Sequence, residues 1–304
     1  MKIMRSVFLL TVLVSMVSCT GGTNKKSSGQ DEGFSFAFLT DIHVEYDKSA
    51  DKGFQMAIES VNEMAPDFVI TGGDLIADAL GQTEERSEML FDLYLEKQEG
   101  FTMPVYNTLG NHDEFGIYER SGVSKENPMY GDKMFEAKIG KRYFSFDHKG
   151  WRFYILDSVE ETEERKYFGH VDSIQVDWLK EELSQTDTTM PLVIVTHIPF
   201  ITAYAQITKG AMVANNRGLV VENSKEVLDV FSGHNLKMVL QGHLHIVEDI
   251  YINNIHFITG GAVCARWWNG PKDGMEEGYM LIQIRPDEGI DWKYIDYGWE
   301  AIAN

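Results

Sequence analysis

The chain has 304 residues, of which 43% are hydrophobic, and a formal net charge of −20 at pH 7. This length and composition are typical of one large α/β domain that follows a short leader. A surface this acidic repels nucleic acid at long range. The sequence also has no basic stripe with interleaved aromatic residues, and we therefore expect no nucleic-acid polymer as partner.

The first eighteen residues have the pattern of an export signal. Lys2 and Arg5 precede an apolar run at residues 7–17, which is too short for an ordinary membrane-spanning helix. The run ends in Met-Val-Ser-Cys at residues 16–19, which resembles the bacterial lipobox although Met16 replaces the usual leucine. We therefore predict a lipoprotein signal peptide at 1–18 and lipidation at Cys19. The alternative is a general signal peptide with a chance cysteine.

Residues 20–32 are rich in Gly, Ser, Thr and Lys and contain no apolar side chain, which is typical of a flexible tether. We predict a tether at 19–32 and one globular domain at 33–304. The protein would be exported and held at a membrane through Cys19. The bacterial outer membrane is favoured because Thr20 is not the Asp that commonly retains lipoproteins in the inner membrane. Cys264 lies among small apolar residues and is expected to be buried.

Strand-like runs alternate with helical patterns in the first third of the domain. Strands are predicted at 34–39, 68–71 and 105–109, with helices at 50–64 and 84–98 between them. This βαβαβ order predicts a parallel sheet with right-handed crossovers.

The rest of the chain predicts more strand than helix. A hairpin is expected at 142–156 around Gly150, followed by a helix at 173–183 and strands at 192–196 and 237–240. Short strands are then expected at 250–252, 255–259, 279–284 and 290–295. Residues 114–128, 202–220 and 266–270 are predicted loops, and loops of this kind are usually functional or disordered.

A cluster of potential metal ligands follows the ends of five predicted strands. They are Asp41, His43, Asp74, Asn111, His112, Asp113, His197, His243 and His245. In an open α/β sheet, ligand sites form beyond the carboxyl ends of the strands, so we expect these side chains to converge. His, Asp and Asn together are typical of a redox-neutral divalent site. Nine groups exceed what one catalytic ion needs, and they favour two ions that share a carboxylate, an arrangement that supports hydrolytic phosphoryl transfer.

Each of these residues also has a structural interpretation. Asn111 fits a turn or a helix cap, and the glycines before Asp74 fit a turn that needs positive φ. Four other histidines are expected to be ordinary surface or core residues: His148, His170, His234 and His256. A structural explanation of the whole ordered series would require five independent coincidences, one at each strand end. Gly-Asn-His-Asp alone is expected by chance in about one chain in a thousand.

The ordered series Asp-x-His, Gly-Asp, Gly-Asn-His-Asp, His and Gly-His-x-His resembles the calcineurin-like metallophosphoesterase family over roughly residues 34–295. The resemblance implies an α/β fold, a four-layer αββα sandwich of two mixed β-sheets flanked by helices. It implies that Asp41, His43 and His245 bind one metal, that Asn111, His197 and His243 bind the other, and that Asp74 bridges both. His112 would face the leaving group, oriented by Asp113, while a hydroxide formed from a shared water attacks phosphorus.

Four further residues are candidates for substrate binding. Trp267 and Trp268, beside Arg266, are candidates to line a pocket that stacks a ring, with the alternative that one of the two Trp side chains belongs to the core. Arg217 could contact a phosphate, with a solvated surface position as its alternative.

We therefore expect a metal-dependent hydrolase of small phosphate esters with two divalent ions, drawn from iron, manganese and zinc. One alternative is a catalytically weak, ligand-binding lipoprotein, and another is an enzyme like the cyclic-nucleotide phosphodiesterases. An enzyme with purple acid phosphatase character is a further, disfavoured alternative, because Leu75, Ile76 and Ala77 follow Asp74, where that group carries a tyrosine ligand. The sequence leaves open the choice of monoester or diester, the physiological substrate, the metal, the membrane leaflet and the oligomeric state.

Overall fold

The structure is a computed structural model that describes residues 33–301, so the predicted signal peptide, the tether and Cys19 lie outside the described residues. Its strands are β1 Phe34–Leu39, β2 Phe68–Thr71, β3 Val105–Tyr106, β4 Phe144–His148, β5 Trp151–Ile155, β6 Val159–Glu161, β7 Tyr167–Gly169, β8 Pro191–Val195, β9 Asn235–Gln241, β10 Val247–Ile252, β11 Ile255–Gly260, β12 Gly278–Ile284 and β13 Ile290–Asp296. Its α-helices are α1 Ala50–Met64, α2 Glu84–Gln98, α3 Lys133–Lys138, α4 Ser173–Ser184, α5 Tyr204–Lys209 and α6 Ser224–Val230. None of the helices within residues 33–301 has the length and apolarity needed to cross a membrane.

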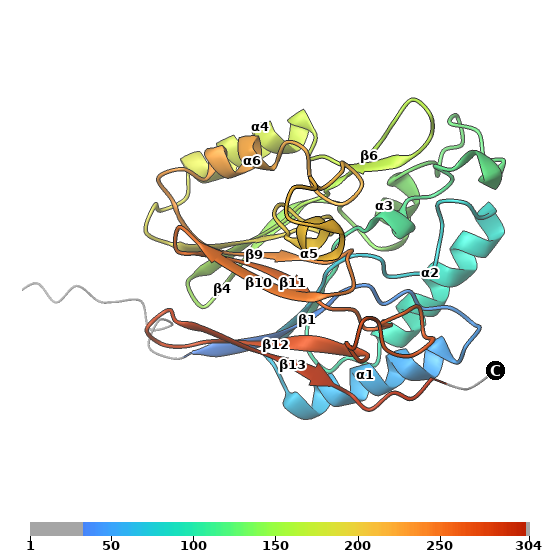
Figure 1. Cartoon of the computed structure of the whole chain (residues 1–304), viewed down its shortest axis with the longest axis horizontal. Coiled ribbons are helices and arrows are strands. Elements are labelled where there is room, and N and C mark those ends of the chain that lie inside the picture. The colour runs from blue at the N-terminus through green and yellow to red at the C-terminus, as the bar shows by residue number, and fades with distance from the viewer. Residues whose placement is uncertain (1–32, 302–304) are drawn as a thin grey trace, which may run out of the picture.

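Two mixed sheets form the centre of the molecule. One has the strand order β13-β12-β1-β2-β3 and the other β10-β11-β9-β8-β5-β4, while β6 and β7 form a separate pair. The strands β1, β2 and β3 are parallel, and so are β5, β8, β9 and β11. Helices α1 and α2 cover one outer face and α4 and α6 cover the other (Figure 1). The predicted four-layer αββα sandwich is confirmed.

The alternation of side chains along β1 explains why both faces of its sheet are covered. Phe34, Phe36 and Phe38 point into the core between the sheets, whereas Ala37 and Leu39 belong to the core beneath the helices. Phe36 stacks on Phe68 with ring centroids 5.1 Å apart and meets Phe153 of the second sheet edge to face at 5.5 Å. These aromatic contacts fix the spacing of the two sheets, and hence of the strand ends that carry the site.

Helix α1 occupies the residues predicted for it because its apolar positions recur at helical spacing. Phe54, Ala57, Ile58 and Val61 are all buried. Phe54 stacks on Tyr94 of α2 at 5.8 Å, so the two helices pack together against the first sheet.

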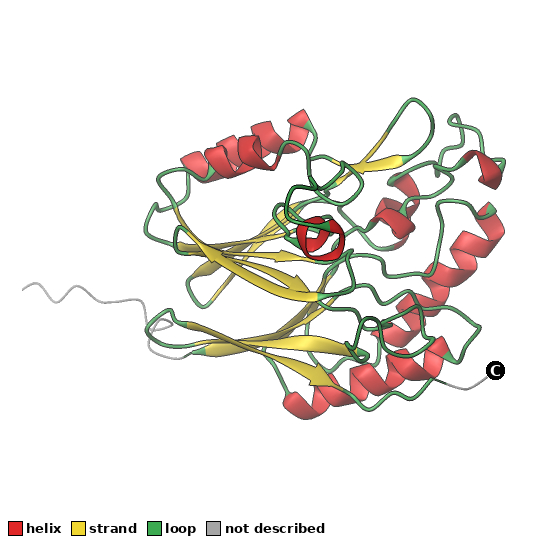
Figure 2. Cartoon of the chain, viewed as in Figure 1, coloured by secondary structure: helices red, strands yellow, loops and turns green. Residues whose placement is uncertain are grey.

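Some predicted segments differ from the structure. The strand expected at 105–109 ends at Tyr106, because Asn107 turns its side chain to Tyr94 of α2 and the amide of Thr108 bonds the Thr71 hydroxyl. The loop expected at 202–220 contains the short helix α5, which Figure 2 shows end on among loops. The loop expected at 114–128 contains one turn of 3₁₀ helix, Glu119–Ser121. The turn between β10 and β11 is tight, since Asn253 and Asn254 have φ of 54° and 64°.

Candidate metal centre

The loops that follow β1, β2 and β9 hold their ligands in an unusual backbone conformation. Five of these residues have positive φ, between 46° and 71°: Asp41, His43, Asp74, His243 and His245. Left-handed backbone at a non-glycine residue costs about 1–3 kcal/mol and is characteristic of functional sites. Backbone hydrogen bonds fix the first two loops to each other, from Asp41 N to Gly73 O at 3.0 Å and from His43 N to Asp74 O at 2.9 Å.

The two carboxylates lie at the centre of the cluster. Asp74 Oδ2 is 3.3 Å from His43 Nε2 and 3.2 Å from His197 Nε2, so one oxygen faces both halves of the site. Asp41 Oδ1 is 3.1 Å from His245 Nε2. Asn111, at the start of the 3₁₀ turn Asn111–Asp113, brings its Oδ1 within 3.0 Å of His197 Nε2. The predicted ligands therefore converge from five strand ends.

Buried donor atoms without partners indicate that this cluster is built for cations. Asp41 Oδ1 and both ring nitrogens of His43 are buried and complete no hydrogen bond of good geometry within residues 33–301, although Asp41 Oδ1 lies 3.1 Å from His245 Nε2 and His43 Nε2 lies 3.3 Å from Asp74 Oδ2. Unpaired buried polar atoms are costly, so their concentration here requires an explanation. Potential ligand atoms gather in two groups that share Asp74, one with Asp41 and His43 and one with His197 and His243. The donor set fits two divalent ions with one carboxylate between them.

Three of the histidines use their outer nitrogen to bind a backbone carbonyl. His197 Nδ1 is 2.8 Å from Gly72 O, His243 Nε2 is 2.8 Å from Gly218 O, and His245 Nδ1 is 2.5 Å from Ala265 O. Such a contact fixes the tautomer and orients the other nitrogen, as is typical of metal-binding histidines. The inner nitrogen of each ring is thereby turned toward the carboxylates.

The electrostatics of the cluster favour cations. Burial opposes ionisation of Asp74, but His197, His112 and His43 lower its pKa well below the usual range. Burial lowers the pKa of His43 to about 3 and, with His197, that of His243 to about 4. Burial also opposes a charge on His197, yet Asp74 and Asp41 raise its pKa to about 9. The negative potential of the two carboxylates is thus strong enough to hold a proton on a buried ring, and a cation there would experience the same attraction.

The structure corrects the expected role of Asp113. We predicted that Asp113 orients His112, but its carboxylate accepts hydrogen bonds from the amides of Gly110, Leu75 and Ile76, at 2.8, 2.9 and 3.2 Å. Asp113 therefore fastens the loop after β3 to the loop after β2, and in that way it positions Asp74 and Asn111.

Asp78 is the partner of His112, and the sequence analysis missed it. His112 Nδ1 is 3.2 Å from Asp78 Oδ1, and the His112 amide donates to Asp74 Oδ1 at 2.8 Å. Asp78 also pairs with Arg120, at 3.4 Å. The signal in the sequence was a second acid four residues after Asp74. It was hidden because the contact depends on how the loop after β2 turns.

The two tryptophans have different roles. The Trp267 ring lies over the site, with its centroid 3.9 Å from that of His43 and 4.9 Å from that of His112. Trp268 is 2% exposed and donates from Nε1 to His43 O at 3.0 Å. Trp267 therefore lies over the centre, whereas Trp268 supports it from behind, which matches the alternative that one of the two tryptophans belongs to the core.

The two predicted arginines have other partners. Arg217 lies over the ring of Phe168, 3.6 Å from its centroid, and pairs with Glu222. Arg266 is exposed and donates to Asn269 O at 3.1 Å. Neither guanidinium is in contact with the ligand cluster among the described residues, so the structure brings neither of them into the centre.

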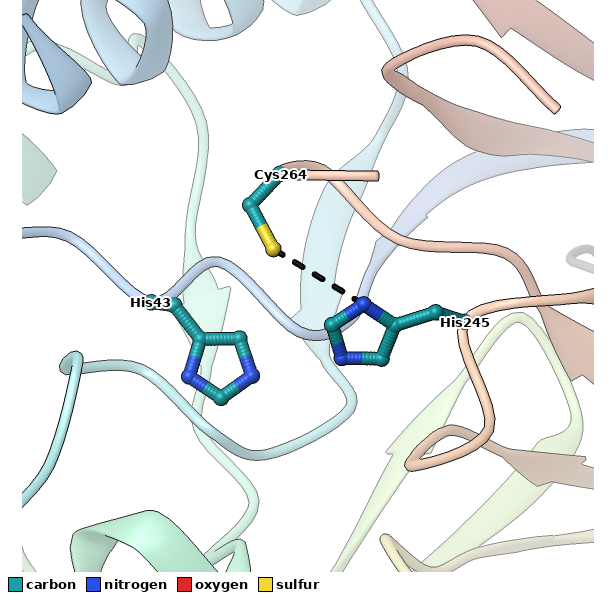
Figure 3. A group of neighbouring side chains, drawn as sticks. All are labelled: His43, His245 and Cys264. Carbon is teal, nitrogen blue, oxygen red and sulfur yellow. Dashed lines mark hydrogen bonds between the residues drawn. The ribbon is translucent and has the colours of Figure 1, made fainter. Parts of the chain in front are cut away.

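Cys264 is buried as predicted, and it lies behind a ligand. Figure 3 shows its thiol directed at the ring of His245, with Sγ 3.9 Å from Nδ1, while His43 faces the same region from the other side. Since Nδ1 is the nitrogen that faces the Ala265 carbonyl, Cys264 packs against the outer edge of His245. Burial raises the pKa of the thiol above its usual value.

Comparisons with known proteins agree with this geometry. The sequence model described as calcineurin-like phosphoesterase matches residues 34–247. The chain is 23% identical over 266 residues to a probable cyclic nucleotide phosphodiesterase of Xenorhabdus bovienii, covering 83% of this chain and 96% of that one. A dimetal phosphatase from Danio rerio has a TM-score of 0.59 at 15% identity, covering 88% of this chain and 100% of that one. GAP50, the anchor in the inner membrane complex of Plasmodium, has a TM-score of 0.57 at 15% identity, covering 90% and 87%.

Proposed function

We propose that this chain, which belongs to the calcineurin-like phosphoesterase family, hydrolyses small phosphate esters by direct attack of water on phosphorus. It is a metal-dependent phosphoester hydrolase, and its cofactors are two divalent metal ions. One observation carries the proposed mechanism: the buried carboxylate of Asp74 lies between His43 and His197, each 3.2–3.3 Å away, in a cluster of unpaired donor atoms.

This arrangement supports the ligand assignment that the family resemblance implies. Asp41, His43 and His245 would hold one ion, Asn111, His197 and His243 the other, and Asp74 both. When bound, the two ions supply an acidified water and neutralise the charge on the phosphoryl oxygens. The fixed outer nitrogens of His197, His243 and His245 keep the ligand rings in place.

The protein's own contribution to bond breaking centres on His112. Asp78 holds His112 Nδ1, which leaves Nε2 to donate a proton to the ester oxygen as the P–O bond breaks. The products are the free alcohol and a phosphate that has gained the oxygen of water. Trp267, packed on His43 and His112, shields this side of the centre from solvent.

A cyclic nucleotide is the second candidate substrate, because the matched Xenorhabdus bovienii protein is described as a probable cyclic nucleotide phosphodiesterase. A cyclic ester has the same scissile P–O bond, so the same residues would act on it. We also retain the proposal that the protein is exported and anchored through Cys19, which makes a cytosolic cyclic nucleotide a less suitable substrate.

A substrate panel tests the proposal. Purified protein would be assayed with nitrophenyl phosphate, bis(nitrophenyl) phosphate and cyclic AMP, each with added Fe²⁺, Mn²⁺ or Zn²⁺. We expect hydrolysis of at least one ester, loss of it after chelation and recovery on adding metal. A metal-loaded protein that binds the esters but hydrolyses none of them would instead identify a ligand-binding protein.

A further inference from the structure

A cavity of about 530 Å³ adjoins the metal centre, and the proposed mechanism makes no use of it. Its lining includes Tyr118, Arg120, Tyr167 and Gly218. Gly218 is the residue whose carbonyl contacts His243 Nε2, at 2.8 Å, and the Tyr167 ring meets the His243 ring edge to face at 5.8 Å. The cavity and the centre therefore share a wall. Its size is within the usual range for small-molecule sites.

Arg120, in the cavity lining, is linked to the proposed proton donor His112 through Asp78. Arg120 pairs with Asp78 at 3.4 Å, and Asp78 holds His112. Burial raises the pKa of the Tyr118 and Tyr167 hydroxyls, and the charge of Asp74 makes a small further contribution to both. A group attached to a phosphate at the metals would therefore have this cavity beside it.

Most side chains that line the cavity are aromatic or positively charged. The Arg120 guanidinium lies 4.5 Å from the centroid of the Tyr118 ring. Of the other basic side chains in the lining, Arg165 donates to the carbonyls of Ile117 and Val123, both at 2.9 Å, and is thereby engaged. Three basic side chains, Arg120, Arg165 and Lys166, are opposed by two acidic ones, Glu119 and Glu164, so the lining has a formal net charge of only +1. Flat rings and a guanidinium suit a planar, uncharged group.

The cavity is built before any ligand arrives. Arg165, beside β7, ties the loop at 117–123 to the β6–β7 hairpin through the two carbonyl contacts. Gly81 leaves room for Arg120, since a Cβ there would lie 2.1 Å from Arg120 Nε. Two segments far apart in the sequence are thus held in one arrangement, which lowers the entropy cost of binding.

We propose that this cavity is the subsite for the organic part of the substrate, and that the substrate is an ester of phosphate carrying a planar ring, an aryl or nucleoside ester. The inference rests on the proposed function, because the phosphate must sit at the metals for its ring to reach Tyr118 and Tyr167. Trp267 is the alternative surface on which the ring of the substrate could stack, but one face of the indole already packs on His43, with ring centroids 3.9 Å apart.

The test compares two phosphonates, one of which carries a phenyl ring where the other carries a methyl group. Phenylphosphonate and methylphosphonate contain P–C bonds that a phosphoesterase does not hydrolyse, so their dissociation constants can be measured by calorimetry on Mn²⁺-loaded protein. We expect phenylphosphonate to bind about tenfold more tightly, the scale of one stacked ring. Tyr118→Leu and Tyr167→Leu should each bring that ratio close to one and leave methylphosphonate binding unchanged.

Controls separate the possible failures. Tyr251→Leu, on β10, removes an exposed tyrosine that packs on His256 and should keep the wild-type ratio. Metal content and unfolding temperature identify any variant that misfolds. If Tyr167→Leu misfolds, Tyr118→Leu still tests the proposal, because Tyr118 is the less buried of the two tyrosines. A ratio of one in the wild-type protein, or a ratio lost in Trp267→Leu and kept in both cavity variants, would overturn the subsite while hydrolysis still supports the proposed function. Failure of both phosphonates to bind, with no ester hydrolysed, would overturn both.

Discussion

Asp74 links more parts of the centre than its single carboxylate suggests. One oxygen faces His43 and His197, and the other accepts the amide of His112 at 2.8 Å. Its own backbone carbonyl binds the amide of His43. The residue therefore sets the distance between the two halves of the site as well as supplying a negative charge.

We predict that Asp74→Asn abolishes hydrolysis and releases metal. The amide keeps the shape of the side chain but removes the negative charge that both ions share, so each ion loses a carboxylate ligand. Metal analysis of the purified variant, beside wild-type protein prepared in the same way, provides the measurement. Occupancy by two metals with near-normal turnover would refute the bridging role.

His112→Ala should separate proton transfer from metal binding. We expect metal content to persist and turnover to fall by roughly 10²–10⁴, the usual scale for a general acid. The loss should be smaller for nitrophenyl esters, whose leaving groups need little protonation.

Asp78→Asn provides the matched variant for His112, since it disturbs the contact at Nδ1 and leaves the ring in place. It should produce a smaller loss with the same dependence on the leaving group. An equal loss across leaving groups in both variants would argue for electrostatic stabilisation rather than proton donation.

The ligands could be predicted from the sequence because each follows the end of an apolar strand, and strand ends converge in this class of fold. The roles of Asp78 and Asp113 could not. Both depend on how the loops after β2 and β3 fold onto each other, and no local pattern records which acid turns toward His112.

At the scale of elements, apolar periodicity in the sequence predicted the three longest helices, α1, α2 and α4, and most strands, whereas the short helices α3, α5 and α6 were not predicted. The bounds of α1 and α2 agree with the prediction: α1 buries apolar residues at helical spacing from Ala50 to Val61, and α2 begins after Thr83, whose side chain accepts from the Arg86 amide. β3 could not be predicted to end at Tyr106, since Asn107 leaves the strand for partners on α2 and β2. The three-residue strands β6 and β7 are too short to show any periodicity.

Gly53 shows how an element supports the centre from a distance. It lies on α1, and a Cβ at this position would be 2.2 Å from the ring of Trp268. Trp268 in turn donates to the carbonyl of His43. The glycine therefore leaves space on a helix for the side chain that holds a ligand loop from behind.

We predict that Gly53→Ala destabilises the protein although alanine favours helix. The gain in helix propensity is about 1 kcal/mol, and overpacking against a buried indole costs about 1–3 kcal/mol. The unfolding temperature should fall, and metal affinity should weaken with it because Trp268 shifts. Gln55→Ala on the same helix, where the side chain bonds only Glu59 in the described structure, is the control and should change neither. An unfolding temperature at or above that of wild type would show that Trp268 adjusts without cost.

On the scale of the whole molecule, a chain with a net charge of −20 acts on a negatively charged substrate. Long-range forces therefore oppose the approach of a phosphate ester. The attraction that overcomes this must be local, and bound cations provide the largest local charges available to a protein. An acidic surface around a buried two-metal centre thus favours small esters that reach the metals and disfavours polyanions, which meet the surface first.

The last prediction concerns how the molecule is placed in the cell. If Cys19 carries acyl chains, the protein should sediment with membranes and partition into detergent, because each buried methylene contributes about 0.8 kcal/mol and several chains make release negligible. Cys19→Ser should give a soluble or unprocessed form that still hydrolyses phosphate esters, since every proposed ligand lies between Asp41 and His245. Cys264→Ser is the matched cysteine variant and should remain with the membrane fraction, because its thiol is buried behind His245 and offers no site for a lipid. Fractionation followed by an ester assay on each fraction measures both properties at once. A Cys19→Ser protein that has lost its leader and still sediments with membranes would show that the anchor is not a lipid on this cysteine.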